Sequence, residues 1–326
     1  MIEYQPCVIE KPGRIIVIGD IHGDIDRLLN ILISTKIFTE RLEWIAEPPN
    51  TVVVQLGDQI DSMDRSGLNA EWDTSSQICT KGILDLNIII LMEKLDSIAI
   101  QAGHGGRVLS LIGNHELLNL MHHFDYVSPC SKRILNPEIR KELFRRGNGQ
   151  ITQLLAKRNV VVKVGKYIFC HGGILPEHLD TIQSTYSHQI NTNDFIHYIN
   201  NTFRKFTLNE FLTPEDIKIL QNVIIGDNGI LWTRFYLSLL IKSGTDSGIH
   251  LIFESVLTNI LSRLDGISMF IGHNIVDSIT AVANSKLFFT DAALSRAFNT
   301  QRIQIIEIVS KENGEDTVNL IEIGCY

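Results

Sequence analysis

The stretch Arg14-Ile15-Ile16-Val17-Ile18-Gly19-Asp20-Ile21-His22-Gly23-Asp24 decides the fold of this 326-residue chain. Short continuous runs of Val and Ile are typical of buried β-strands. In open α/β sheets, ligands bind at the carboxyl ends of the strands. Asp20 and His22 directly follow the predicted strand, so they are candidate metal-binding groups at a sheet edge. The alternative is an ordinary strand-to-helix turn, in which Asp20 or Asp24 caps a helix predicted over 25–33.

Four other predicted strands end with the same kind of side chain. The strands predicted over 51–56, 107–112, 167–170 and 268–271 lead directly into Gly57-Asp58, Gly113-Asn114-His115-Glu116, His171-Gly172-Gly173 and Gly272-His273. A single short motif is only a hypothesis, but five of them at strand ends indicate one shared site. Asp, Asn and His without a thiolate favour Mn, Fe or Zn over a structural zinc site. About six such ligands fit a pair of ions better than one tetrahedral ion.

The composition is that of a folded protein and excludes some partners. Hydrophobic residues make up 44% and charged residues 20% of the chain, whereas disorder needs fewer apolar residues. The net charge is −8, so the broad basic surface of a protein that binds duplex nucleic acid is missing. We therefore expect no duplex nucleic acid as a partner, and only local recognition of phosphate.

The cysteines and the hydropathy pattern indicate a location. The five cysteines are scattered and odd in number, which argues against a complete disulfide framework and favours a reduced compartment. Residues 1–14 lack the apolar core of a signal peptide. No apolar run approaches the roughly 20 residues that span a bilayer. The sequence predicts a cytoplasmic protein without a membrane partner.

With these motifs, the chain resembles the calcineurin-like metallophosphoesterases, and within them the phosphoprotein phosphatase type. It also resembles the bacterial-like relatives of that type, the Shewanella-like phosphatases and the diadenosine tetraphosphatase-like enzymes, and the resemblance extends from Gly19 to about Arg296. The resemblance implies an α/β fold in which two mixed β-sheets pack as a sandwich flanked by helices. It implies a single domain over 1–326, with a polar insert at about 62–80 and a helical insert at about 176–265.

The resemblance also implies a role for each motif residue. The six implied ligands of two divalent or trivalent transition-metal ions (Mn, Fe or Zn) are Asp20 and His22 for the first ion, Asp58 as a bridge, and Asn114, His171 and His273 for the second. His115 is the implied general acid, and Asp61 is its implied hydrogen-bond partner. A nearby carboxylate favours the imidazolium that an acid needs. A hydroxide that bridges the two ions is the implied nucleophile, so no covalent phosphoenzyme is required.

One departure from the family pattern concerns an arginine. The family usually has Gly-Asp-X-X-Asp-Arg-Gly, but here Ser62 follows Asp61 and Arg65 comes three residues later. Either three residues are inserted and Arg65 contacts the phosphate, or that arginine is missing. The insertion is favoured because guanidinium groups suit phosphate oxygens.

The later motifs refine the resemblance. Gly272-His273-Asn274-Ile275 lacks a second His, which favours the phosphoprotein phosphatase branch over the nuclease and phosphodiesterase branch. Ile230-Leu231-Trp232-Thr233-Arg234 resembles the stretch in which Arg234 would bind phosphate; the alternative is a buried Trp beside a surface Arg. Asp291-Ala292-Ala293-Leu294-Ser295-Arg296 resembles the closing stretch near the metals, or is an ordinary helix cap.

Three functions remain open at this stage. The first is a dinuclear-metal phosphatase that hydrolyses phosphomonoesters of phosphorylated Ser or Thr in proteins, with phosphotyrosine as an alternative. The second is a hydrolase of dinucleoside polyphosphates or of nucleotide-capped RNA ends. The third is a metal-free scaffold, which would predict degraded ligands, whereas all six are present. The expected partner is a phosphorylated protein or a small phosphoester.

Overall fold

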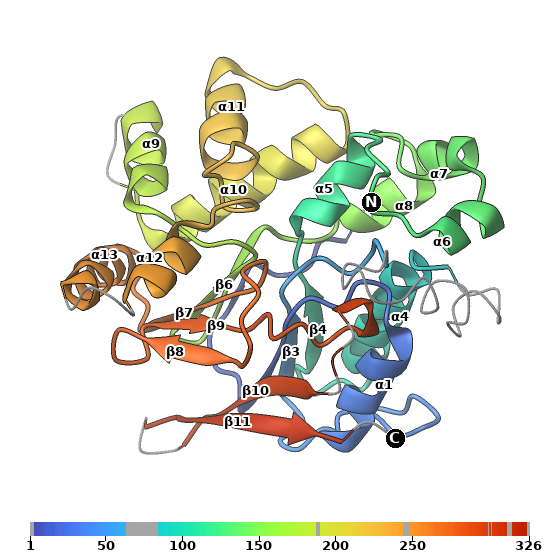
Figure 1. Ribbon diagram of the computed structural model, residues 1–326, viewed down its shortest axis with the longest axis horizontal. Coiled ribbons are helices and arrows are strands. Elements are labelled where there is room, and N and C mark those ends of the chain that lie inside the picture. Colours follow the sequence, from blue (N-terminus) through green and yellow to red (C-terminus); the bar gives the residue numbers. More distant parts are fainter. Residues whose placement is uncertain are drawn as a thin grey trace.

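Two mixed β-sheets form the centre of the molecule (Figure 1). The structure, a computed structural model, describes residues 3–62, 84–186, 190–243, 248–298, 300, 302–311 and 315–324. One sheet has the order β1 (Val8–Ile9), β5 (Val161–Val164), β6 (Tyr167–Cys170), β7 (Ser268–Ile271), β9 (Leu287–Phe289), β8 (Thr280–Val282). The other has the order β11 (Thr317–Ile323), β10 (Ile303–Val309), β2 (Arg14–Ile18), β3 (Val52–Gln55), β4 (Arg107–Ser110).

Three strands of each sheet run parallel, and these are the strands that carry the motifs. In the five-stranded sheet, β3 pairs in parallel with both β2 and β4. In the six-stranded sheet, β7 pairs in parallel with both β6 and β9. The carboxyl ends of parallel neighbours lie at the same edge of a sheet, so each sheet brings its own motifs together.

The sheets pack against each other through alternate side chains of their strands. Ile15 and Val17 belong to a core that both sheets share, whereas Ile16 and Ile18 belong to the larger core that includes the helices. In the shared core, the ring of Phe270 stacks on a neighbouring ring at a centroid distance of 4.5 Å. β2 is therefore buried on both faces, which explains its continuous apolar run. The predicted fold, two mixed sheets flanked by helices, is confirmed.

The helices form two groups along the chain (Figure 1). Those before β6 are α1 (Ile25–Ser34), α4 (Asn87–Gln101), α5 (Asn114–Leu120), α6 (Pro129–Ile134), α7 (Pro137–Leu143) and α8 (Gln150–Leu155). Those between β6 and β7 are α9 (Pro176–Tyr186), α10 (Thr192–Thr207), α11 (Pro214–Ile219), the π-helix η1 (Leu220–Ile224), α12 (Phe235–Ser243) and α13 (Ile249–Arg263). A short 3₁₀ helix, η2 (Arg296–Phe298), precedes β10. None of the helices in the described part of the chain has the length and hydropathy that crossing a membrane requires.

The second group of helices occupies the segment predicted as a helical insert at about 176–265. Its assignment as an insert within a single domain over 1–326 stays a prediction. The polar insert predicted at about 62–80, together with Arg65, lies outside the described residues except for Ser62.

α5 begins at Asn114, directly after the N-cap residue Gly113, whose amide donates a hydrogen bond to Glu116. Cys130 is disulfide-bonded, whereas Cys7 and Cys170 are free, so the structure contains a disulfide although the scattered cysteines favoured a reduced compartment. Sequence spacing does not show which cysteines meet in space. The cytoplasmic location stays a prediction.

Candidate metal centre

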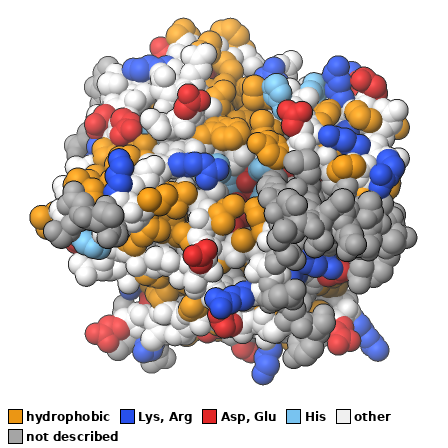
Figure 2. Space-filling model, in the orientation of Figure 1, with side chains coloured by type: hydrophobic (Ala, Val, Ile, Leu, Met, Phe, Trp, Pro, Cys, Tyr) orange, Lys and Arg blue, Asp and Glu red, His pale blue; other side chains and the backbone are white. Residues whose placement is uncertain are grey.

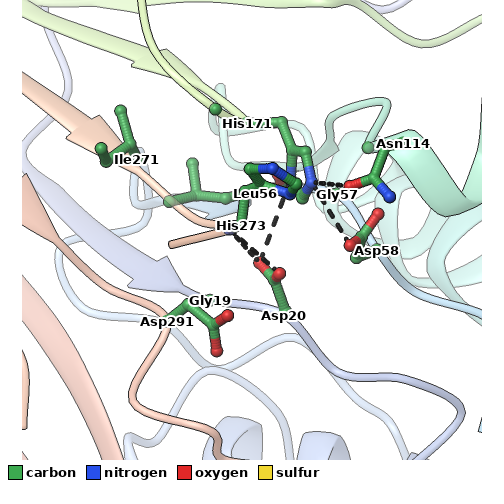
Figure 3. A network of polar contacts seen from close by, with 12 residues as sticks. Gly19, Asp20, Leu56, Gly57, Asp58, Asn114, His171, Ile271, His273 and Asp291 are labelled. Atoms are coloured by element: carbon green, nitrogen blue, oxygen red, sulfur yellow. Dashed lines mark hydrogen bonds and ion pairs between the residues drawn. The ribbon is translucent and has the colours of Figure 1, made fainter. Parts of the chain in front are cut away.

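The strand-end motifs of the two sheets lie side by side (Figure 3). The amide of His273, after β7, donates to Asp20 Oδ2, after β2, at 3.1 Å. His171 Nε2, after β6, lies 2.9 Å from Asn114 Oδ1 and 3.3 Å from Asp58 Oδ2. All five predicted motifs therefore supply side chains to one cluster. In the space-filling view, His and acidic side chains show in a hollow near the centre of one face (Figure 2).

The backbone at the site has an uncommon conformation. His22, Asp58 and His273 have φ values of 46°, 51° and 59°, in the left-handed region that non-glycine residues seldom adopt. Such strain persists where the surrounding structure holds it in place, and it is concentrated at functional sites. Two glycines make the close approach possible: a Cβ on Gly113 would collide with Asp58, and one on Gly272 with Asp20.

Each of the three predicted histidine ligands has one ring nitrogen engaged by a backbone carbonyl. The ring N–H groups donate as follows: His22 Nδ1 to Ile60 O (3.1 Å), His171 Nδ1 to Leu56 O (2.8 Å) and His273 Nε2 to Trp232 O (3.0 Å). In the neutral form of each ring, the other nitrogen is an acceptor. Metal-binding histidines typically have this arrangement, because the carbonyl fixes the tautomer and the ring orientation.

The carboxylates of the site repel one another in a buried setting. Burial, Asp291 and Asp58 raise the pKa of Asp20 well above its ordinary value. Burial likewise raises the pKa of Asp291 to about 6 and, with Asp58, the pKa of Glu116. Burial alone would raise the pKa of Asp58 as well, but His171 and His115 hold it well below its usual range. A bound cation would offset this repulsion, so the donor set fits a metal site.

Two groups of side chains have the geometry to hold an ion. One comprises His22, Asp58 and His115, and the other comprises Asp58, His171 and His273. Within each group, the potential ligand atoms all lie within 4.8 Å of one another. Asp58 belongs to both groups, as a bridging carboxylate would. The structure thus fits two ions, although the identity of the metals and the division of the ligands between them stay predictions.

His115 lies at the edge of the cluster and has two different neighbours. Its Nδ1 donates to Asp61 Oδ2 at 2.7 Å, as predicted. Its Nε2 lies 3.8 Å from Asp58 Oδ2, which is why His115 joins the first group of potential ligands. An imidazole that is held at Nδ1 and faces the cluster through Nε2 has the geometry of a proton donor.

The two predicted arginines have different outcomes. Arg65 lies outside the described residues. Arg234 is exposed, and its Nη1 donates to the carbonyl of His273 at 3.2 Å. This contact places a guanidinium beside a candidate metal ligand, and the group has further N–H donors that could bind phosphate.

Glu116, which belongs to the motif after β4, supports the site in a way that the sequence analysis did not predict. Its Oε2 accepts from the amides of Asp58 (2.9 Å) and Gly113 (2.7 Å), and its Oε1 accepts from the amide of Gln59 (2.8 Å). It therefore joins the turn after β3 to the start of α5. A Glu at the third position of a helix that begins at Asn114 is a capping-box signal that could have revealed it.

Comparisons with known proteins agree with this geometry. Residues 13–229 match the family model described as calcineurin-like phosphoesterase. The chain is 34% identical over 169 residues to Shewanella-like protein phosphatase 1 of Plasmodium berghei, covering 51% of this chain but only 40% of that protein. It is 25% identical to Shewanella-like protein phosphatase 2 of Arabidopsis thaliana, covering 92% and 76% of the two chains.

A solved structure shows a similar fold. It is a cold-active protein-tyrosine phosphatase of a psychrophilic Shewanella species, with a TM-score of 0.68 and 20% identity. The match covers 97% of this chain and 83% of that one. At this identity the likeness concerns the fold alone.

Proposed function

Since the chain belongs to the calcineurin-like phosphoesterase family and is a metal-dependent phosphoesterase, we propose that it hydrolyses phosphomonoesters of Ser and Thr in phosphorylated proteins. The observation that carries the proposal is the cluster itself. It has two groups of potential ligands that share Asp58, and His115, which belongs to one of these groups, is hydrogen-bonded to Asp61. The matches to two Shewanella-like protein phosphatases support a phosphoprotein as the substrate.

We assign the predicted ligands to the metals of this centre. Asp20 and His22 would hold one ion, Asn114, His171 and His273 the other, and Asp58 both. When bound, two such ions lower the pKa of a water molecule and offset the charge of the phosphoryl group. The carbonyl contacts of the three histidine rings keep their acceptor nitrogens turned toward the centre.

His115 would give a proton to the departing oxygen of the substrate. Its Nε2 is the nitrogen on the side of the cluster, and the bond from Nδ1 to Asp61 keeps the ring in this orientation. The carboxylate of Asp61 also favours the protonated ring that an acid requires. Arg234 would bind the phosphate oxygens beside His273.

A specific observation favours phosphotyrosine as a second candidate substrate. The ring of Tyr126 lies edge-on to the ring of His115, with centroids 4.9 Å apart, and Tyr126 is 42% exposed. A phenyl ring of the substrate could pack on this side chain near the leaving group. Dinucleoside polyphosphates remain the alternative that the sequence left open.

A substrate panel tests the proposal. The protein is reconstituted with Mn, Fe or Zn and offered phosphoserine, phosphothreonine and phosphotyrosine peptides beside diadenosine tetraphosphate. We expect the highest kcat/KM on the phosphoserine or phosphothreonine peptides. A higher value on phosphotyrosine would move the assignment to the second candidate. A preference for diadenosine tetraphosphate would reject a protein phosphatase.

A further inference from the structure

A buried polar cluster lies on the side of His115 that faces away from the candidate ligands. It consists of Asp61, Asp85, Asn119 and Arg140, whose exposed fractions are 0%, 0%, 0% and 1%. Asp61 follows β3, Asp85 precedes α4, Asn119 lies on α5 and Arg140 on α7. Four segments far apart in the sequence thus supply one side chain each.

Arg140 is the centre of this cluster. Its Nη1 and Nη2 donate to the two carboxylate oxygens of Asp85 at 2.8 and 3.0 Å. Its Nη2 also lies 3.4 Å from Asp61 Oδ1, and its Nε donates to Asn119 Oδ1 at 2.8 Å. Two-pronged guanidinium–carboxylate contacts of this kind fix the geometry as well as the charge.

The partners of Arg140 in turn hold Asp61. Asn119 Nδ2 donates to both carboxylate oxygens of Asp61 at 3.0 Å, and Asp85 Oδ2 accepts from the amide of Asp61 at 3.0 Å. Side chain and backbone of Asp61 are therefore both held from the side of Arg140. Asp61 Oδ2 also accepts from His115 Nδ1, at 2.7 Å.

Fold stability is a poor explanation for this cluster. Burying charged groups is costly, and well-packed apolar side chains often replace a buried ion pair without loss of stability. Burial by itself would raise the pKa of Asp85, but Arg140 lowers it below the ordinary value, so the carboxylate is kept as an anion. Groups that must hold one orientation need this kind of support from fixed hydrogen bonds.

We propose that Arg140 is a positioning residue for hydrolysis: with Asp85 and Asn119 it holds Asp61, and Asp61 holds the ring of His115 against the leaving group. This inference rests on the proposed role of His115 as the general acid. Arg140 is 1% exposed and contacts Asp61, Asp85 and Asn119, so its removal should affect the reaction through what the acid contributes.

The test compares two substrates whose leaving groups differ in basicity. The leaving group of a phosphoserine peptide is a basic serine oxygen that needs a proton to depart. The leaving group of p-nitrophenyl phosphate is weakly basic and departs without one. We expect Arg140→Met to lower kcat on the peptide at least about tenfold more than on p-nitrophenyl phosphate, within the range that acid catalysis contributes. Metal content should equal that of the unsubstituted protein. Arg140→Lys, which keeps the charge without the planar fork, should shift the ratio in the same direction and guards against a variant that fails to fold.

The matched control is Arg158, another buried arginine. It is 2% exposed and donates to Gln59 Oε1 and to the carbonyl of Ile89, without contact to Asp61. Arg158→Met should leave the ratio of kcat on the peptide to kcat on p-nitrophenyl phosphate unchanged, even if both rates fall.

A double-mutant cycle tests whether Arg140 acts through His115. If Arg140 acts through the acid, adding Arg140→Met to His115→Asn should not change the ratio further. The inference would be overturned if Arg140→Met folds and keeps the ratio of the two kcat values that the unsubstituted enzyme has. It would also be overturned if Arg140→Met lowers this ratio further in the His115→Asn background. If His115→Asn itself slows both substrates equally, the proposed acid role is wrong, and this result is distinct from a failure of Arg140.

Discussion

The backbone amide of His273 donates to the carboxylate of Asp20 at 3.1 Å, across 253 residues of sequence and from one β-sheet to the other. Gly272 makes this contact possible, because any side chain there would collide with Asp20. The candidate metal centre is therefore shared between the sheets. Neither sheet alone holds a full set of ligands.

Loss of the shared carboxylate should be the most damaging change at the site. We expect Asp58→Asn to reduce kcat more than Arg234→Ala does, because Asp58 belongs to both ligand groups. Elemental analysis should find about two transition-metal ions per chain in the unsubstituted protein and fewer in Asp58→Asn. Full activity in a chelated, metal-free preparation would contradict the assignment.

The fall in rate on removing the proposed acid should depend on the substrate. His115→Asn should slow a phosphoserine peptide about 10²–10⁴-fold, and p-nitrophenyl phosphate far less, because only the serine oxygen needs a proton to depart. Asp61→Asn should show the same asymmetry in milder form. The two rates and the metal content are measured on one preparation. An equal loss on both substrates, together with lost metal, would make His115 a ligand or a support for Asn114 instead.

The close packing of two turns predicts a steric effect at Gly113. Its φ of −104° suits any residue, so Gly113→Ala causes no backbone strain, but the new Cβ would collide with the amide and carboxylate of Asp58. We expect a loss of about 1–3 kcal/mol in the free energy of unfolding, together with weaker metal binding. Gly324→Ala is the control, since no other heavy atom lies within 4 Å of the added Cβ. Calorimetry and metal titration of both variants check the prediction, which fails if the two behave alike.

A buried histidine away from the site predicts acid sensitivity. His178 accepts from the amide of Leu175 at Nδ1 and donates from Nε2 to the carbonyl of Asn228, and burial lowers its pKa from 6.5 to about 4. Between these two values the unfolded chain binds a proton that the folded chain excludes. Stability therefore falls as the pH decreases from about 6.5 toward 4.

A variant without this ring should be less sensitive to acid. From about pH 7 to about pH 4.5, His178→Gln should lose about 2 kcal/mol less stability than the unsubstituted protein, because it has no such proton to exclude. Urea unfolding at the two pH values measures the difference. His197→Gln is the control, because His197 is exposed on α10. Parallel pH profiles for the unsubstituted protein and His178→Gln would contradict the assignment.

The sequence by itself determined the strands and the residues at their ends. A run such as Arg14–Ile18 is a local pattern, and the residue that follows a buried strand lies at the sheet edge whatever the rest of the chain does. The six ligands, His115 and Asp61 could therefore be proposed from spacing and resemblance.

Only the tertiary structure decided what surrounds these residues. The carbonyls that orient the three histidine rings belong to Leu56, Ile60 and Trp232, and no local pattern marks them as partners. The same holds for Arg140. In the sequence it has no feature that distinguishes it from an exposed helix residue, yet it is 1% exposed and contacts Asp85 and Asp61. Hydrogen bonds between distant segments depend on where the folded chain places its backbone. Periodicity and motif spacing describe only residues that are close together in the sequence, so they cannot predict such contacts.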